Sequence, residues 1–306
     1  MTVLSEHLAR YLQLRRALGY GYQHHDRLLG DFVNYLETSG QSAVTVDAAL
    51  GWSSDATTDR SGATRLSAVR GFARYLVAFD QRTQIPPSGL IRENHVRPTP
   101  YIYSPAEIAA LIDVAEKLTP PVWAATMATV IGLMAATGLR PGEVYRLGRS
   151  HVDFADAQLR VMHSKHGKSR QLPLHPTTIS ALRRYARLRD RAFAEPTSDG
   201  FFLTTDGADL RSELVTDTFA RLLNAAPIRT PDGRRPPRVG DLRHTFAVST
   251  LLSWHQTGVD VQRHLPILSA FLGHNAPAAT FWYLEATPEL MALAAARLAS
   301  SWEGRS

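Results

Sequence analysis

Apolar residues recur at helical spacing through the first 95 residues of the chain. Three groups of them lie three or four positions apart, so each covers one face of a predicted helix. They are Leu4, Leu8, Tyr11 and Leu12; Leu28, Leu29, Phe32, Val33 and Leu36; and Leu66, Val69, Ala73 and Leu76. The pattern predicts a small helical domain over residues 1–95.

A linker follows this domain. Residues 86–89 and 97–100 are rich in proline, which favours neither helix nor strand. Ser104, Pro105 and Glu107 then match a helix start, because serine can cap the helix and glutamate three residues later can complete a capping box. We therefore expect a linker at residues 96–103 and a second domain over residues 104–306.

The second domain contains both segments typical of helices and segments typical of strands. A long apolar segment, residues 122–136, ends at Gly138 and predicts a helix. Three short segments, residues 151–154, 159–162 and 170–174, are typical of strands, and helical patterns then continue to an apolar segment at residues 288–302. The expected fold class is mainly α with a small antiparallel β-sheet.

Composition narrows the function classes. The 306 residues are 44% hydrophobic and 20% charged, which suits a globular protein, and the net charge of +6 favours a polyanionic partner such as nucleic acid. The absence of cysteine excludes disulfides, cysteine zinc sites and thiol nucleophiles. No signal peptide or apolar membrane span is visible, so we expect a cytoplasmic, nucleoid-associated protein.

Arg140 stands at a predicted rigid corner. It lies between Gly138, which suits a helix end, and Pro141, which suits a helix start. Glu143, three residues later, can brace its guanidinium. A surface Arg–Glu pair meets this spacing equally well, so the corner alone indicates no function.

Further motifs follow in a fixed order. They are the turn from Lys165 to Arg170 before a predicted return strand, the segment Asp241-Leu242-Arg243-His244-Thr245-Phe246, the triplet Leu272-Gly273-His274, and Tyr283. With the Arg140 corner, this ordered set resembles the tyrosine recombinase family of the phage integrase and Xer type. The resemblance covers residues 104–290 well and the helical N-terminal part in outline.

The resemblance implies a role for each residue. Tyr283 is the nucleophile that forms a 3′-phosphotyrosyl link, and Arg140 and Arg243 hold the phosphate oxygens. His274 donates a further hydrogen bond, and Lys165, with Lys168 as the alternative, protonates the leaving 5′-oxygen. Supporting positions are Glu143, which orients Arg140, and His244. The resemblance implies neither a metal nor a cofactor.

One position departs from the family pattern. The family usually has a histidine three residues before the second arginine, where this chain has Gly240. Water or another donor such as His163 could fill the role, the enzyme could be slow, or the chemistry could be lost. His244 is a poor substitute, because adjacent helical residues such as Arg243 and His244 point about 100° apart.

Several other basic residues are candidate DNA contacts, with an ordinary solvated surface as the alternative. They are Arg65, Arg70, Arg74, Lys168, Arg170, Arg234, Arg235 and Arg238.

The resemblance also implies the activity and its partners. It implies site-specific strand exchange through a Holliday junction, by a homo-tetramer on double-stranded DNA with an inverted-repeat core site. We favour a mobile-element integrase or transposase. The alternatives are a catalytically impaired accessory subunit and a type IB topoisomerase-like enzyme. The helix expected at residues 288–302 docks either on its own domain or on a neighbouring subunit.

Overall fold

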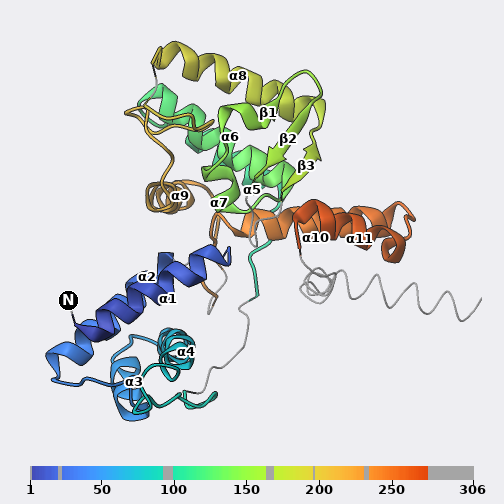
Figure 1. The fold of residues 1–306 in the computed structure, drawn as a ribbon. Helices are drawn as coiled ribbons and strands as arrows, with labels where there is room; N and C mark the ends of the chain where they lie inside the picture. The colour runs from blue at the N-terminus through green and yellow to red at the C-terminus, as the bar shows by residue number, and fades with distance from the viewer. Residues whose placement is uncertain are drawn as a thin grey trace, which may run out of the picture. The chain divides into compact units, whose positions relative to one another are not determined.

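The computed structural model describes residues 2–19, 23–91, 99–162, 169–195, 197–230 and 234–274. The chain divides into two compact units, Met1–Arg97 and Pro98–Ser306. Figure 1 shows that the described part of the first unit is helical, whereas the second combines helices with a small sheet. The chain is therefore mainly α with a small antiparallel sheet.

The first unit is built from helices around one apolar core. These are α1 (Val3–Ala17), α2 (Gln23–Thr38), α3 (Val46–Ser54) and α4 (Asp59–Leu76). Leu29, Phe32 and Leu36 of α2 and Val69 and Ala73 of α4 are fully buried, which confirms the apolar faces expected for these two helices. The sequence pattern did not predict α3, whose first turn is capped by the side chain of Thr45.

The second unit contains most of the secondary structure. Its helices are α5 (Pro105–Ala115), α6 (Pro121–Thr137), α7 (Pro141–Tyr145), the short 3-10 helix η1 (Arg149–His151), α8 (Pro176–Ala192), α9 (Ser212–Ala225), α10 (Asp241–Gln256) and α11 (Val261–Leu272). Helix α6 packs against α5, α8 and α10, which explains its continuous apolar sequence. The capping box at α5 is confirmed, since Ser104 Oγ accepts from Glu107 N and the Glu107 carboxylate accepts from Ser104 N.

The sheet of the second unit is antiparallel, in the order β1-β2-β3. Its strands are β1 (Val152–Asp153), β2 (Gln158–Val161) and β3 (Arg170–Pro173). Leu159 pairs with Leu172, and both are buried against the domain core. The same register pairs Val161 with Arg170 at the start of β3. The predicted strands are confirmed, with β1 and β3 shorter than expected and β2 shifted by one residue toward the N-terminus.

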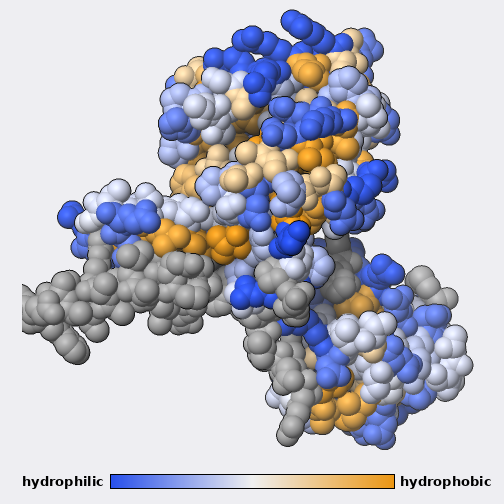
Figure 2. Space-filling view, turned by 180° about the vertical axis from the view of Figure 1, so that it is seen from behind, coloured by the Kyte–Doolittle hydropathy of each residue, from blue (hydrophilic) through white to orange (hydrophobic). Residues whose placement is uncertain are grey.

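The hydropathy of the helices and the exposed residues of α11 complete the description of the fold. None of the helices in the described segments is long and apolar enough to span a membrane. On α11, Ile267 is 61% exposed, and Figure 2 shows hydrophobic residues along this part of the molecule.

Candidate functional site

The first component of the site is the turn between α6 and α7. Gly138 ends α6 in the left-handed region, with φ of 61°. A Cβ at Gly138 would lie 2.5 Å from Cδ1 of Phe246 and 2.9 Å from Cδ2 of Leu272, so glycine allows the turn to pack directly on α10 and α11. Arg140 caps the start of α7, and its side chain is 28% exposed. The corner expected around Arg140 is therefore confirmed.

Glu143 joins Arg140 to a second arginine. Its Oε1 accepts from Arg140 Nη1 at 2.8 Å and from Arg170 Nη1 at 3.0 Å. Its Oε2 accepts from Arg170 Nη2 at 2.8 Å and from the backbone N–H of Arg140 at 3.1 Å. The carboxylate thus accepts four hydrogen bonds and links α7 to the start of β3.

This cluster is largely removed from solvent. The side chain of Glu143 is 2% exposed and that of Arg170 is 13% exposed. Burial raises the pKa of Glu143, but the hydrogen bonds and positive charges of Arg170 and Arg140 outweigh burial and lower that pKa to about 2. Glu143 is therefore ionised at neutral pH. Arg170 was expected to contact DNA, whereas the structure places its guanidinium against Glu143.

Arg243 is the third guanidinium of the site. It extends from the first turn of α10 and is 6% exposed. Its Nη1 donates to the carbonyl of Gly138 at 2.7 Å, and its Nη2 donates to the carbonyl of Leu272 at 2.8 Å. These two carbonyls end helices α6 and α11, so Arg243 fixes the two helix ends relative to each other.

His274 lies beside Arg243, just after α11. The distance between Arg243 Nη2 and His274 Nε2 is 2.9 Å. Burial, followed by the positive charges of Arg243 and Arg140, lowers the pKa of His274 to about 4. The imidazole is therefore neutral at physiological pH.

Arg140 and Arg170 also contact the end of α11. Arg140 Nη2 donates to the carbonyl of Gly273 at 2.8 Å, and Arg170 Nε donates to the carbonyl of Phe271 at 2.8 Å. Gly273 has φ of 68°, and a Cβ there would lie 2.7 Å from Arg170 Nη1. Glycine is thus required at this position both for its backbone conformation and for the close approach of the guanidinium.

Residues far apart in the sequence therefore meet at one place in the second unit. Arg140, Arg170 and Arg243 carry three positive charges, Glu143 carries one negative charge, and His274 is neutral. Guanidinium groups donate in a planar fork that matches phosphate oxygens. Arg140 is the most exposed of the three arginines, so a phosphate group can reach it most easily. The geometry therefore suits a phosphate placed against Arg140.

Some predicted site residues lie outside the described residues. These are the nucleophile candidate Tyr283, the general-acid candidates Lys165 and Lys168, and His163. Their roles stay predictions.

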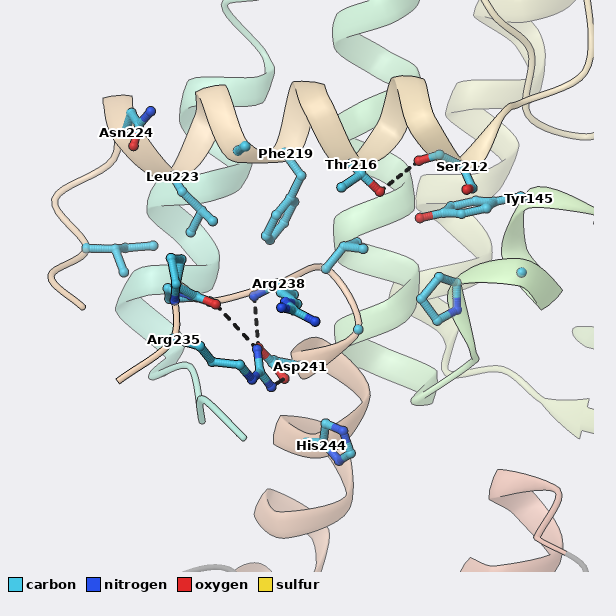
Figure 3. A pocket seen from close by; sticks show the side chains of 18 of the residues that line it. Tyr145, Ser212, Thr216, Phe219, Leu223, Asn224, Arg235, Arg238, Asp241 and His244 are labelled. Atoms are coloured by element: carbon cyan, nitrogen blue, oxygen red, sulfur yellow. Dashed lines mark hydrogen bonds and ion pairs between the residues drawn. The ribbon is translucent and has the colours of Figure 1, made fainter. Parts of the chain in front are cut away.

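A pocket of about 1290 Å³ lies next to this cluster, lined by residues of α7, α9 and the start of α10. Figure 3 shows the side chain of Arg235 and the backbone of Arg238 next to Asp241, with His244 about one turn further along α10. Arg235 forms a bidentate ion pair with Asp241, at 2.7 and 2.9 Å, and the backbone N–H of Arg238 donates to the same carboxylate at 2.8 Å. Arg235, predicted as a DNA contact, thus also holds the loop before α10.

Gly240 lines the same pocket, as does His244. Gly240 has an ordinary right-handed helical backbone, with φ of −64°. A Cβ there would meet nothing closer than Pro141 Cγ at 3.9 Å. Neither backbone strain nor crowding therefore requires glycine at this position.

The remaining predicted DNA contacts differ in exposure. Arg74, Arg234 and Arg238 are exposed. Arg65 lies over the ring of Trp52 and donates to its carbonyl at 2.9 Å. Arg70 donates to the carbonyls of two prolines, Pro86 and Pro87, each at 2.8 Å. Arg65 and Arg70 thus stabilise the first unit itself, and DNA contact by any of these residues stays a prediction.

Comparison with known proteins identifies the family. A model of the phage integrase family matches residues 103–289, which include Arg140, Arg243 and His274. The y4rB protein of Sinorhizobium fredii, classed as a candidate integrase/recombinase, is 38% identical over 317 residues and covers 100% of both chains. The chain belongs to the phage integrase family of tyrosine recombinases.

Other tyrosine recombinases show the extent of the likeness. The tyrosine recombinase XerD of Chlorobaculum tepidum is 26% identical over 223 residues, which cover 72% of this chain and 69% of that protein. The Tn1549 transposon integrase, solved in complex with transposon right end DNA, aligns with a TM-score of 0.66 at 17% identity. This alignment covers 98% of this chain and 100% of that chain, and it confirms the predicted fold class.

Sequence reasoning missed the pairing of Arg170 with Glu143. The two residues are 27 positions apart, and no local pattern joins them. The available signal was weak: an arginine at the first position of a predicted strand that follows a basic turn. The carbonyls of Gly138, Phe271, Leu272 and Gly273 were also missed, since backbone acceptors leave no trace in the sequence.

Proposed function

We propose that this tyrosine recombinase family member is a site-specific DNA recombinase that cleaves and rejoins DNA through a 3′-phosphotyrosyl intermediate. The observation that carries the proposal is the convergence of Arg140, Arg243 and neutral His274 around the ends of α6 and α11. Such a cluster stabilises the charge that develops on phosphate oxygens during transesterification.

In the proposed step, the hydroxyl oxygen of Tyr283 attacks the phosphorus of a DNA phosphodiester, and the proton of this hydroxyl passes to a water molecule. A bond forms between that oxygen and phosphorus, and the bond from phosphorus to the 5′-oxygen breaks. Lys165 gives a proton to the leaving 5′-oxygen. The tyrosyl ester keeps the energy of the broken phosphodiester bond. Religation reverses these transfers and therefore consumes no nucleotide.

Arg140 and Arg243 have different roles in this proposal. Arg243 is buried and donates to two backbone carbonyls, so it mainly sets the position of His274 and the helix ends. Arg140 is more exposed and meets a non-bridging oxygen with its guanidinium. His274 donates from Nδ1, because Nε2 faces the donor Nη2 of Arg243.

Strand exchange then proceeds through a Holliday junction on an inverted-repeat core site. We propose a homo-tetramer on DNA, in which Arg74, Arg234 and Arg238 contact the phosphate backbone from exposed positions. Their positive charges act without reading base sequence, so they add affinity rather than specificity.

Gly240 favours a second candidate function. Because the position has no side chain, the histidine usual for the family cannot donate to phosphate there. A chain limited in this way can serve as a DNA-binding accessory subunit beside an active relative.

Covalent trapping separates the two functions. The chain is incubated in EDTA with a nicked duplex that carries the end sequence of its DNA element, from which cleavage releases a short strand and so traps the protein. The recombinase proposal predicts an SDS-resistant protein–DNA adduct for the wild type and for Tyr145→Phe, a buried control tyrosine, and none for Tyr283→Phe. Gel retardation without any adduct contradicts it and favours the accessory subunit.

A further inference from the structure

Arg170 does not face outward as a DNA contact. Three of its donors point into the protein: Nη1 and Nη2 to Glu143, and Nε to the carbonyl of Phe271. With a side chain only 13% exposed, it has little surface to offer a duplex. Its position in the cluster calls for another explanation.

The charges of the cluster supply one. Glu143 holds Arg140 in place through Oε1, but a lone carboxylate beside a guanidinium forms a pair with no net charge. Such a pair attracts a phosphate weakly, because the carboxylate repels the phosphate as strongly as the guanidinium attracts it at long range. A second guanidinium on the same carboxylate restores a net positive charge while the orienting hydrogen bonds remain.

We propose that Arg170 is a positioning residue that offsets the negative charge of Glu143, so that Arg140 is held rigidly and still presents a net positive charge to the scissile phosphate. The inference rests on the proposed function, since it assigns Arg140 to the phosphate. It assigns an electrostatic role in the site to Arg170, which lies outside the sequence motif that carries Arg140.

The geometry also connects Arg170 to the far side of the site. Its guanidinium packs on Gly273, whose carbonyl accepts from Arg140 and whose neighbour is His274. The start of β3, the α7 corner and the end of α11 therefore share one ion cluster. Loss of Arg170 leaves Glu143 to Arg140 alone and removes one support of the α11 end.

The test compares two duplexes with the same sequence. One has an ordinary phosphodiester at the scissile position, and the other has a methylphosphonate, which carries no negative charge in the ground state. Cleavage rates are measured for the wild type, Arg170→Gln and Arg170→Lys, and for Arg160→Gln as the matched control. Arg160 lies on the neighbouring strand β2, where its half-exposed side chain pairs with Asp153 at 3.3 Å.

We expect Arg170→Gln to slow cleavage of the phosphodiester about 10- to 100-fold, the same range as the loss seen when a residue that orients a metal ligand is removed. The loss becomes smaller on the methylphosphonate, because the neutral group depends less on net positive charge. Arg170→Lys keeps the charge and recovers part of the rate, and Arg160→Gln cleaves like the wild type.

A double variant distinguishes the electrostatic role of Arg170 from a purely structural one. Glu143→Gln/Arg170→Gln removes both charges, so Arg140 again carries a net positive charge, and we expect faster cleavage than with Arg170→Gln alone. A purely structural role predicts slower cleavage, because more contacts are lost.

Slower cleavage by Glu143→Gln/Arg170→Gln than by Arg170→Gln overturns the inference while leaving the proposed function intact, and so do two further results. They are wild-type cleavage by Arg170→Gln, and an equal loss on both duplexes. If the wild type forms no adduct on either duplex, the proposed function fails and the inference falls with it.

Discussion

Arg243 donates a hydrogen bond from Nη2 to Nε2 of His274 over 2.9 Å. A guanidinium has donors only, so Nε2 must act as the acceptor and the imidazole proton must lie on Nδ1. A protonated imidazole has an N–H at both nitrogens and would set two donors against each other. The contact therefore fixes both the neutral state and the tautomer of His274.

The first prediction concerns acid stability. The pKa of His274 is about 4 in the folded chain, whereas the ordinary pKa of histidine is 6.5. Between about pH 4 and pH 6.5 the unfolded chain therefore binds the proton more readily than the folded chain. Folding stability contributed by neutral His274 is present above about pH 6.5 and is lost as the pH falls toward 4. In urea unfolding, the wild type should lose more stability between about pH 7 and about pH 5 than His274→Gln does. Equal losses would contradict the neutral imidazole.

The second prediction concerns Gly138. Alanine there combines an unfavourable positive φ with a Cβ 2.5 Å from Phe246, and we expect a loss of about 3 kcal/mol in unfolding free energy. Gly258→Ala is the matched control, since its φ is 77° and no atom lies within 4 Å of its Cβ. The control should cost about 1 kcal/mol, from the backbone alone. If both variants lose the same unfolding free energy, the close approach of Gly138 to α10 does not contribute to stability.

The third prediction compares two buried tyrosines. Tyr145 is 8% exposed, and its hydroxyl has no hydrogen-bond partner among the described residues; burial raises its pKa to about 12. Tyr145→Phe should raise the unfolding free energy by about 1 kcal/mol, because a buried hydroxyl without a hydrogen-bond partner destabilises the folded state. Tyr185→Phe should cost about 1 to 3 kcal/mol, because its hydroxyl accepts from the N–H of Leu203 at 3.2 Å. A large cost at Tyr145 would reveal a partner for its hydroxyl.

The fourth prediction concerns Gly240. A side chain fits there, since the backbone is right-handed helical and the nearest atom to a Cβ is 3.9 Å away. If cleavage is limited by the missing imidazole, Gly240→His should raise the cleavage rate at least about tenfold over Gly240→Ala, at unchanged thermal stability. Equal rates would mean that another group already fills the role.

The sequence predicted those parts of the site that depend on near neighbours. Ser104 and Glu107 form their capping box within four residues, and Gly138 and Pro141 define the Arg140 corner by local backbone preference. The ordered motifs then indicated the family, which the comparisons confirm.

Contacts between distant residues could not be predicted in this way. Arg170 carries the same charge whether it meets Glu143 or a DNA phosphate, and only the strand register places it beside α7. Arg235 is similar, since its pairing with Asp241 depends on the path of the loop before α10. Helix α3 was missed because its short sequence mixes small and polar residues, and packing against α2 and α4 decides its structure.

The main-chain carbonyls around the arginine cluster have an evolutionary consequence. Arg140, Arg170 and Arg243 all donate to carbonyl oxygens at the ends of α6 and α11. No amino-acid substitution removes a carbonyl oxygen, so these acceptors persist while the side chains around them diverge. Relatives with little sequence in common can therefore inherit the same guanidinium arrangement, provided that the two helices end in the same place.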